Sequence, residues 1–305
     1  MEKIQILMST YNGEKYINEQ LESLLKQEYP NVSILIRDDG SKDSTSSIVG
    51  EFKEKHSQIQ LIKGKNVGVI SSFFDLVLQA DEDADYFAFC DQDDYWKPTK
   101  LSRAISLLEK ENPSIPLLYF SKLDLVDDQL KFLKHSQIPP RGAGLENALI
   151  QNIATGCTIV FNRAMLELFK SKVPDVEKVT MHDAWFYLLA TAFGKTVYDE
   201  ESHLLYRQHS SNTLGMANNK LKSAMIRYKN FQKTGKEKPF TKQTEEFYRL
   251  FKDKLSSNQR KIVEDFLYKR ESFVNRLLYT MNTPLYRQNQ RDTIIFKLLY
   301  ALKSY

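Results

Sequence analysis

Three carboxylates lie within four residues in the segment Asp91-Gln92-Asp93-Asp94, directly after an apolar run. Carboxylates this close repel one another and raise each other's pKa, so the segment predicts a cation among them. Asp91 and Asp93, one residue apart, can direct oxygens at one hard divalent cation. Mg²⁺ and Mn²⁺ commonly combine one or two carboxylates with substrate phosphates, so the sequence predicts a site for a metal-bound diphosphate.

Two more polar clusters follow apolar runs nearer the N-terminus. The first apolar run is followed by Ser9-Thr10-Tyr11-Asn12-Gly13-Glu14, and the second is followed by Asp38-Asp39-Gly40-Ser41. In an open parallel sheet, ligands bind beyond the carboxyl ends of the strands, so three clusters at such ends favour one shared site. Tyr11 can stack on a planar ring such as uracil or thymine, and an N–H of that ring can donate to Asp39. The alternatives are a turn and helix cap at 38–41 and core packing of Tyr11.

The elements that must position these clusters alternate between strand and helix patterns over the first 125 residues. Such alternation predicts an α/β fold with a mainly parallel central sheet and helices on both faces, followed here by a C-terminal helical extension. The patterns predict strands at 3–9, 32–37, 59–63, 86–90 and 117–120, with helices at 14–26, 43–56, 71–79 and 97–110. After a loop at 137–144, they predict a helix at 145–151, a strand at 158–161, a helix at 184–193 and short strands at 197–198 and 204–207.

The last third of the chain differs in charge from the rest. Residues 1–205 contain 22 Lys and Arg against 31 Asp and Glu, a balance of −9, whereas residues 206–305 contain 21 against 8, a balance of +13. From about residue 216 the pattern is helical, with breaks near 235–239, 256–258 and 282–284. Basic amphipathic segments at 220–233 and 293–303 can lie on an anionic membrane, and packing on the rest of the chain or homodimer formation are the alternatives.

Composition places the chain among ordinary globular proteins, with 42% apolar and 27% charged residues in 305. The sequence contains no run of 18 apolar residues and no signal-peptide pattern. It has only two cysteines, Cys90 and Cys157, so a disulfide framework is not expected. We therefore expect a cytoplasmic protein, with peripheral contact to the inner face of the membrane if the basic segments bind there.

The segments MSTYNGEKYI, IRDDGSKDST and CDQDDYW, in this order, resemble the nucleotide half of family 2 glycosyltransferases, which have the GT-A fold. The resemblance covers roughly residues 3–215 and implies a nucleotide-sugar donor. It implies that Asp91-Gln92-Asp93 is the DxD motif that binds the metal and the donor diphosphate. The residues that it places around the nucleotide are Thr10, Tyr11, Asn12, Glu14, Asp39 and Asp91.

Sugar transfer also requires a base that takes the proton of the acceptor hydroxyl. Met181-His182-Asp183-Ala184-Trp185 is similar to the HDxW segment of bacterial rhamnosyltransferases, which implies that Asp183 is this base. A helix cap is the alternative for Asp183. Gly156 and His182 are expected on the acceptor or sugar side, and Trp96 and Trp185 either line the sugar site or pack in the core.

The segment Tyr206-Arg207-Gln208-His209-Ser210-Ser211-Asn212 is similar to the YRQHxxN segment of the same rhamnosyltransferase-like group. This resemblance implies that His209 completes the metal shell beside Asp91 and Asp93, since neutral imidazole is a competent ligand. Arg207 either neutralises the diphosphate or forms a structural ion pair.

The resulting hypothesis is an inverting glycosyltransferase that requires Mg²⁺ or Mn²⁺ and acts in bacterial cell-surface polysaccharide or glycoconjugate synthesis. It moves a sugar from a nucleotide-sugar donor to a glycan acceptor that can be lipid-linked. The preferred hypothesis for the donor is TDP-rhamnose, so that the sugar is rhamnose. The alternatives are a UDP-hexose donor and, in a different class, a non-catalytic nucleotide-sugar-binding protein; a nucleic-acid partner is not expected. The expected domains are a catalytic domain at 1–215, with a nucleotide-binding half at 1–125 and an acceptor half at 126–215, and a basic helical region at 216–305.

Overall fold

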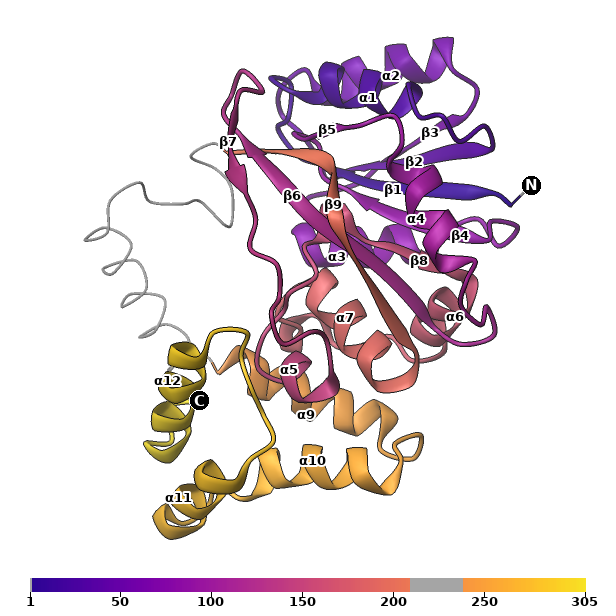
Figure 1. Cartoon of the computed structure of the whole chain (residues 1–305). Helices are drawn as coiled ribbons and strands as arrows, with labels where there is room; N and C mark the ends of the chain where they lie inside the picture. Colours follow the sequence, from indigo (N-terminus) through magenta and orange to yellow (C-terminus); the bar gives the residue numbers. More distant parts are fainter. Residues whose placement is uncertain (1, 209–237) are drawn as a thin grey trace. The chain divides into compact units, whose positions relative to one another are not determined.

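The computed structural model describes residues 2–208 and 238–305, which fall into two compact units (Figure 1). A strand-rich unit contains residues 2–138, 154–171 and 193–208. A helical unit contains residues 139–153, 172–192 and 238–305. The expected domain boundary at residue 215 lies outside the described residues and remains a prediction.

The first four strands form the parallel half of a sheet. In this half, β1 pairs with β2 and β4, and β2 pairs with β3, all in parallel. Their bounds are β1 (Ile4–Thr10), β2 (Val32–Asp38), β3 (Ile59–Lys63) and β4 (Tyr86–Cys90). Each strand lies within one residue of its predicted position, so the prediction of a parallel sheet in this part of the chain is confirmed.

The second half of the sheet is mixed. It contains β5 (Tyr95–Trp96), β6 (Leu117–Val126), β7 (Phe132–His135), β8 (Val160–Asn162) and β9 (Lys195–Arg207). In this half β6 and β9 are parallel. The other pairs are antiparallel: β8 pairs with β4 and with β6, β5 pairs with β9, and β7 pairs with β6. Within the described residues the order is β3-β2-β1-β4-β8-β6-β9-β5, with β7 on β6.

One long strand, β9, replaces the two short strands predicted at 197–198 and 204–207. Its pairing with β6 shifts register between Ser121 and Lys122 and again between Lys122 and Asp124. Irregularities of this kind are β-bulges, which let a strand continue where its alternating pattern is interrupted. The polar residues 199–202 interrupt the apolar pattern, and for that reason the sequence predicted two strands instead of one.

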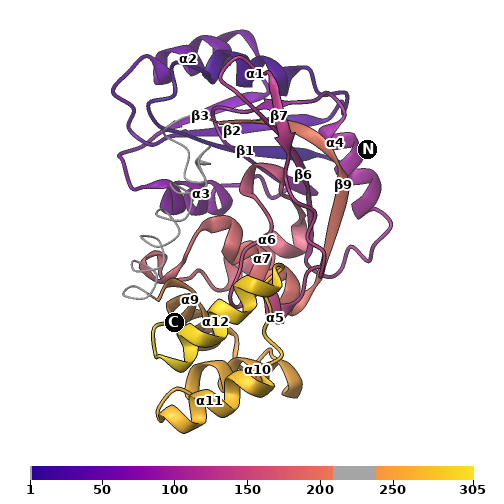
Figure 2. The ribbon, with the colours of Figure 1, turned by 60° about the vertical axis from the view of Figure 1, so that its left-hand side comes forward.

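Helices cover both faces of this sheet, as predicted (Figures 1 and 2). The helices α1, α2 and α4 share a buried cluster with one face, and α3 and α6 pack on the other. Their bounds are α1 (Ile17–Leu25), α2 (Thr45–Lys55), α3 (Val69–Leu78), α4 (Lys100–Leu108) and α6 (Arg163–Ser171). The helix α6 was not predicted.

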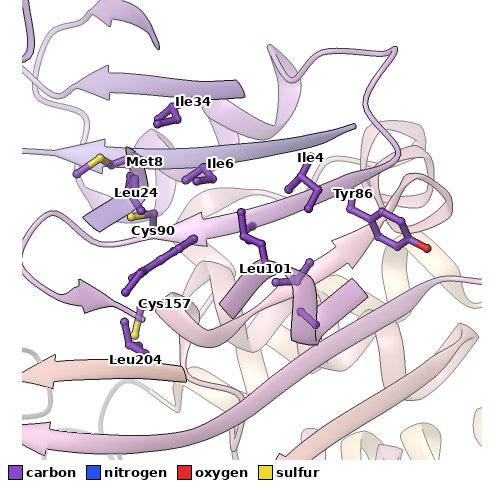
Figure 3. Packing of buried hydrophobic residues seen from close by; sticks show 14 of the residues in the cluster. Ile4, Ile6, Met8, Leu24, Ile34, Tyr86, Cys90, Leu101, Cys157 and Leu204 are labelled. Carbon is purple, nitrogen blue, oxygen red and sulfur yellow. The ribbon is translucent and has the colours of Figure 1, made fainter. Parts of the chain in front are cut away.

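The strands β1 and β4 are buried on both faces, which explains why their sequences are mainly apolar. Ile4, Ile6 and Met8 point to the face that carries α1 and α4 (Figure 3). On the opposite face, the ring of Phe89 in β4 lies 5.3 Å from that of Phe73 in α3. Burial of each such side chain stabilises the fold by roughly 1.5–3 kcal/mol, so the centre of the sheet is a firm support for the loops at its edge.

The helical unit packs around aromatic contacts. Trp185 lies edge-on to Phe247, with ring centroids 6.4 Å apart, and the Tyr305 hydroxyl donates to the Ile150 carbonyl oxygen over 2.9 Å. The unit contains α5 (Leu145–Ala148), α7 (His182–Phe193), α9 (Pro239–Phe251), α10 (Ser257–Tyr268), α11 (Phe273–Asn282) and α12 (Gln290–Ala301). The prediction of a C-terminal helical region is confirmed from residue 239 onward, and the part predicted at 216–237 lies outside the described residues.

None of the helices in 2–208 and 238–305 combines the length and apolarity that crossing a membrane requires.

Candidate active site

The three predicted loops begin at neighbouring positions along one edge of the sheet. Thr10 and Asp38, the last residues of β1 and β2, are paired, and Cys90 at the end of β4 pairs with Met8 of β1. The carboxyl ends of these parallel strands therefore lie side by side, where open α/β sheets bind ligands. The structure thus brings together the loops that contain residues 10–14, 38–41 and 91–94.

Tyr11 lies on the surface of the first loop and is 41% exposed, so it does not pack in the core. Its backbone is held by the side chain of Gln92, in the middle of the acidic segment. The Tyr11 N–H donates to Gln92 Oε1 over 2.8 Å, and Gln92 Nε2 donates to the Tyr11 carbonyl oxygen over 3.0 Å. This pair of hydrogen bonds joins the loop after β1 to the loop after β4.

Asn12 and Glu14 join the first loop to the second. The Asn12 N–H donates to Ser41 Oγ over 2.9 Å, and Asn12 Oδ1 accepts from the Lys42 N–H over 2.8 Å. Glu14 Oε2 accepts from the Ser44 N–H over 2.9 Å. Asn12 adopts φ +48°, a left-handed conformation that Asn tolerates better than most residues. These two predicted nucleotide-binding residues therefore also shape the loop that carries Tyr11.

Asp39 is buried, and its carboxylate is fixed by several donors. Its Oδ1 accepts from Arg37 Nη1 and from the Val67 N–H over 2.9 Å, and its Oδ2 accepts from the Gly68 N–H over 3.0 Å. Arg37 is itself buried and pairs with Asp75 at 3.2 Å. A carboxylate offers about four acceptor positions, so Asp39 keeps capacity for one more donor in a fixed orientation.

The carboxylates after β4 differ in their environments. Asp91 and Asp93 are half-buried, whereas Asp94 is fully buried and its Oδ1 accepts from the Arg207 N–H over 3.2 Å. Burial, followed by the charges of Asp93 and Asp91, raises the pKa of Asp94 well above its usual range. One oxygen of Asp91, one of Asp94 and the Cys157 Sγ lie within 4.8 Å of one another.

These residues fit a hard divalent cation through their oxygens. Burial raises the pKa of the Cys157 thiol well above its usual range, and a protonated thiol is a poor ligand for Mg²⁺ or Mn²⁺. The oxygens that the structure groups belong to Asp91 and Asp94, and the ligand role predicted for Asp93 beside Asp91 remains a prediction. The third predicted ligand, His209, lies outside the described residues and remains a prediction.

A buried lysine accompanies the acidic loop. The Lys100 ammonium lies 3.1 Å from the ring centroid of Trp96, and both side chains are buried in the strand-rich unit. Burial lowers the pKa of Lys100 to about 8, against the opposing effect of Cys90, Cys157 and the aspartates of the loop. Trp96 packs in the hydrophobic core, which is one of its two predicted positions. A part for Trp96 in the sugar site stays a prediction.

Arg207, at the end of β9, is buried and binds the loops of the strand-rich unit together. Its Nε donates to the Asp93 carbonyl oxygen over 2.9 Å, its Nη1 donates to the Asp128 carbonyl oxygen, and its Nη2 pairs with Glu19. The guanidinium also lies 4.7 Å from the Tyr16 ring centroid. Arg207 thus forms the structural ion pair that the sequence left open, and its predicted contact with a diphosphate remains untested.

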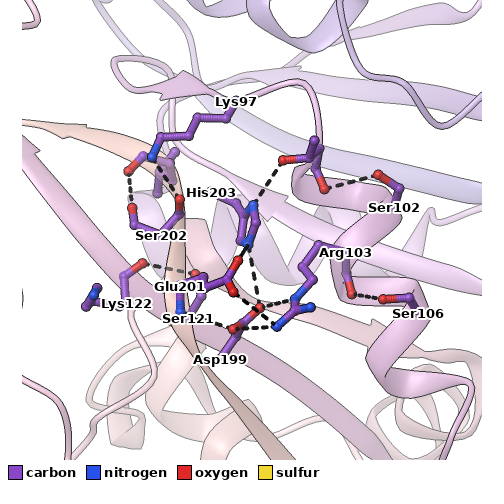
Figure 4. A network of polar contacts seen from close by, with 12 residues as sticks. Lys97, Ser102, Arg103, Ser106, Ser121, Lys122, Asp199, Glu201, Ser202 and His203 are labelled. Atoms are coloured by element: carbon purple, nitrogen blue, oxygen red, sulfur yellow. Dashed lines mark hydrogen bonds and ion pairs between the residues drawn. The ribbon is translucent and has the colours of Figure 1, made fainter.

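A polar network around Asp199 anchors β9, the strand that carries Arg207 (Figure 4). Asp199 accepts from Arg103 Nε over 2.8 Å and from the Tyr119 hydroxyl over 3.2 Å. Burial raises the pKa of Asp199, but the His203 ring, whose Nε2 lies 3.6 Å away, and the hydrogen bonds from Arg103 outweigh burial and hold the pKa below its usual range. The network therefore ties β9 to α4 and β6 through a buried ionised carboxylate.

The predicted base and its neighbours belong to the helical unit. Asp183 lies in the first turn of α7, and its Oδ1 accepts from the Ala184 N–H over 2.6 Å. His182 is buried, and burial lowers its pKa to about 3, so the ring is neutral at physiological pH. Trp185 is fully buried in this unit. The roles predicted for these three residues remain predictions.

Some residues of the site carry no signal that sequence reasoning used. The sequence identifies Gln92 only as the variable position of the acidic motif, and Arg37 only as the end of a strand. Lys100 lies on α4, four residues after Trp96, where a lysine is usually solvated. Gly156, by contrast, was named from the sequence. It starts a buried turn that includes Cys157, and its role on the acceptor side stays a prediction. A charged residue within an otherwise apolar helix face is the signal that could have identified Lys100.

Comparison with known proteins agrees with this geometry. The family model described as glycosyl transferase family 2 matches residues 5–169, more than half of the chain. The dTDP-rhamnosyl transferase RfbG of Shigella flexneri is 32% identical over 223 residues, which cover 68% of this chain and 73% of that protein. The UDP-Glc:alpha-D-GlcNAc-diphosphoundecaprenol beta-1,3-glucosyltransferase WfgD of Escherichia coli is 30% identical over 170 residues, which cover 54% of this chain and 62% of that protein.

Solved structures share the fold. The structure of Staphylococcus aureus TarS residues 1–349 in complex with UDP has a TM-score of 0.60 at 17% identity, covering 99% of this chain and 80% of that one. The mannosyltransferase PcManGT of Pyrobaculum calidifontis, in complex with GDP-Man and Mn²⁺, has a TM-score of 0.55 at 15% identity, covering 99% and 85%. The chain belongs to glycosyl transferase family 2, the GT-A glycosyltransferases that transfer sugar from a nucleotide-sugar donor.

Proposed function

We propose that this protein is an inverting, metal-dependent rhamnosyltransferase that transfers rhamnose from dTDP-rhamnose to a glycan acceptor in bacterial cell-surface polysaccharide or glycoconjugate synthesis. The observation that carries the proposal is the meeting of three loops at one sheet edge: an exposed Tyr11, a fixed Asp39 and the pair Asp91 and Asp93. These groups match the ring, the N–H donor and the metal-bound diphosphate of a nucleotide sugar.

The donor end follows from the chemistry of these side chains. Tyr11 stacks on the base, and Asp39 accepts from its ring N–H, while Thr10, Asn12 and Glu14 hold the pentose of the nucleoside. Asp91 and Asp93, with His209 as a third ligand, hold Mg²⁺ or Mn²⁺, which when bound neutralises the diphosphate leaving group. Arg207 supports this end by fixing the backbone of Asp93.

The acceptor end rests on Asp183. In a single displacement the acceptor oxygen bonds to the anomeric carbon as the bond to the diphosphate breaks, and a carboxylate removes the hydroxyl proton. Asp183, half-buried in the first turn of α7, is proposed for this role. His182, neutral because it is buried, and Trp185 and Gly156 are proposed to lie on the acceptor or sugar side.

The choice of rhamnose rests on the name of the Shigella relative and on the segments around Asp183 and Arg207. A UDP-hexose donor is the alternative, since the E. coli relative is named for UDP-Glc. That relative is also named for a diphosphoundecaprenol-linked acceptor, so we propose a lipid-linked glycan acceptor for this protein as well. Such an acceptor favours a cytoplasmic location close to the membrane.

The donor can be tested by thermal unfolding with Mn²⁺ and a panel of dTDP-rhamnose, dTDP-glucose, UDP-glucose, UDP-GlcNAc and GDP-mannose. A ligand that binds the native state raises the unfolding temperature by mass action, and the largest rise is expected with dTDP-rhamnose. Slow hydrolysis of that donor, abolished by EDTA and restored by Mn²⁺, separates an enzyme from a non-catalytic binder. A larger rise with a UDP-hexose would replace the rhamnose proposal, and binding without hydrolysis would favour the non-catalytic alternative.

A further inference from the structure

The helices α11 and α12 present a large apolar surface to solvent. Nine of the eighteen large hydrophobic side chains exposed in the described residues lie on this helix pair, and they are 46–70% exposed. We call this surface the α11–α12 face. It consists of Phe273, Val274, Leu277, Leu278 and Met281 of α11, together with Ile294, Ile295 and Leu298 of α12 and Leu302 just beyond it. Patches of this kind in soluble proteins mark an interaction site.

The spacing shows that each helix turns its apolar side outward. On α11 the exposed apolar residues recur at intervals of one, three and four, which places them on one side of the helix. The opposite side carries Tyr279, which is buried and lies 4.7 Å from the ring of Tyr300 in α12. Arg276 Nε also donates to the Ala301 carbonyl oxygen over 2.8 Å. The pair is therefore fixed through its inner side, and the α11–α12 face has no part in holding it together.

The charges around the α11–α12 face are mainly positive. Residues 269–305 contain seven Lys and Arg against two acidic residues, Glu271 and Asp292, a balance of +5. Arg291 and Lys303 are exposed and Lys297 is half-buried. Within the described part of the chain these three cations form no ion pair with a carboxylate. Their charges therefore remain available to an external anionic partner.

We propose that the α11–α12 face docks in the headgroup layer of an anionic lipid bilayer. Aliphatic and aromatic side chains flanked by Lys and Arg are the composition that binds such an interface, with apolar groups at the acyl boundary and cations at the phosphates. A second copy of the chain fits less well, because self-association through this face brings two positively charged rims together.

This inference concerns a surface outside the donor and acceptor residues, and it goes beyond the proposed transfer reaction. Binding to vesicles is measured without donor, acceptor or metal, so a failure here is separate from a failure of the proposed function. If both hold, docking brings the enzyme to the membrane surface in which a lipid-linked acceptor resides.

Sedimentation of the full chain with vesicles tests the docking. We expect binding to vesicles of phosphatidylcholine with 30% phosphatidylglycerol, weaker binding at high salt and little binding to phosphatidylcholine alone. The double variant Leu278→Gln/Leu298→Gln changes two side chains that are 55% and 59% exposed, so the fold is retained, and it should weaken binding roughly tenfold or more. The matched control Leu133→Gln, at a 53% exposed leucine of β7, should leave binding unchanged.

Two further variants keep the test independent of folding. Arg291→Gln/Lys303→Gln should weaken binding to anionic vesicles roughly fivefold per cation. Because Cys90 and Cys157 are buried, a cysteine introduced by Met281→Cys can be labelled selectively with a polarity-sensitive dye. Its emission should shift to the blue with anionic vesicles, whereas a label introduced by Leu133→Cys should not respond.

Three outcomes overturn the proposal. The first is no binding to anionic vesicles at low salt, and the second is binding that neither double variant weakens. The third is a dimer, seen by sedimentation velocity without lipid, that Leu278→Gln/Leu298→Gln dissociates, because the face would then belong to self-association.

Discussion

The side chain of Gln92 forms two hydrogen bonds with the backbone of Tyr11, one in each direction, at 2.8 Å and 3.0 Å. Gly13 completes this contact, because a Cβ at position 13 would lie only 2.2 Å from Gln92 Oε1. The middle residue of the proposed metal-binding motif thus fixes the residue proposed to stack on the base. One amide therefore joins the two loops of the proposed donor site.

This contact predicts a coupled effect of two small changes. Gln92→Ala removes both hydrogen bonds and should raise the KM for donor roughly five- to tenfold, with a smaller effect on kcat, because a positioning contact worth about 1 kcal/mol is lost. Gly13→Ala should act in the same direction, because its methyl group displaces the amide. Steady-state kinetics of both variants with Mn²⁺ measure these effects.

The double variant provides the control. The three atoms nearest to a Cβ at position 13 all belong to Gln92, so Gly13→Ala should have little further effect once residue 92 is alanine. Additive losses in the double variant would show that Gly13 matters for another reason. An unchanged donor KM in Gln92→Ala would show that the two hydrogen bonds do not position Tyr11.

Asp93 and Asp94 should respond differently to removal of their carboxylates. Asp93 is half-buried, and its backbone carbonyl is held by Arg207, so Asp93→Ala should keep the fold and abolish transfer at saturating Mn²⁺. Asp94 is fully buried and accepts from the Arg207 N–H, so Asp94→Ala should lower the free energy of unfolding by about 1–3 kcal/mol. Chemical unfolding and turnover of both variants test this contrast. Near-normal turnover of Asp93→Ala would remove Asp93 from the metal site.

The fold was largely predictable because its central strands carry strong local signals. β3 and β4 begin and end at the predicted residues, since an apolar run between polar turns determines a buried parallel strand. β5 has only two residues and the four residues of β7 are all exposed, so neither strand has an apolar pattern from which it could be predicted. β9 was predicted as two strands because its bulges interrupt the alternation of side chains.

The site was predictable where ionisable residues cluster along the sequence and unpredictable where they meet only in space. The carboxylates of the acidic segment stand together in the chain, so their chemistry could be inferred. The contacts of Arg207 with Glu19 and Asp128, and of Arg37 with Asp75, join positions that no local spacing relates. The hydrogen bonds of Gln92 likewise depend on the approach of two loops 81 residues apart.

His182 should make the protein sensitive to acid. Burial lowers its pKa to about 3, from 6.5 in the unfolded chain. Between these values the unfolded chain binds a proton that the native state does not, so the free energy of unfolding falls as the pH falls, by up to ~1.4 kcal/mol per pH unit. Urea unfolding between pH 7.5 and pH 4.5 should show this slope, and His182→Gln should reduce it. The control is His56→Gln, at a half-buried histidine that follows α2, and it should keep the pH slope of the wild type. An equal slope in the wild type and in His182→Gln would assign the acid sensitivity to other groups.

Asp183 gives the most direct test of the catalytic assignment, because its two candidate roles depend on different properties of the side chain. As a structural residue in the first turn of α7 it needs an oxygen acceptor, and its Oδ1 accepts from the Ala184 N–H. As a base it needs a proton-accepting carboxylate. Asp183→Asn keeps the acceptor and removes the base.

We expect turnover of Asp183→Asn to fall by roughly two to four orders of magnitude, the range usual for loss of a general base, with donor KM and unfolding temperature little changed. Asp183→Ala removes both the acceptor and the base, so it should also lower the unfolding temperature. Measuring turnover per folded molecule, with folding followed by circular dichroism, separates the two effects. If Asp183→Asn kept its turnover while Asp183→Ala lost stability, Asp183 would cap α7 and the base would have to be found elsewhere.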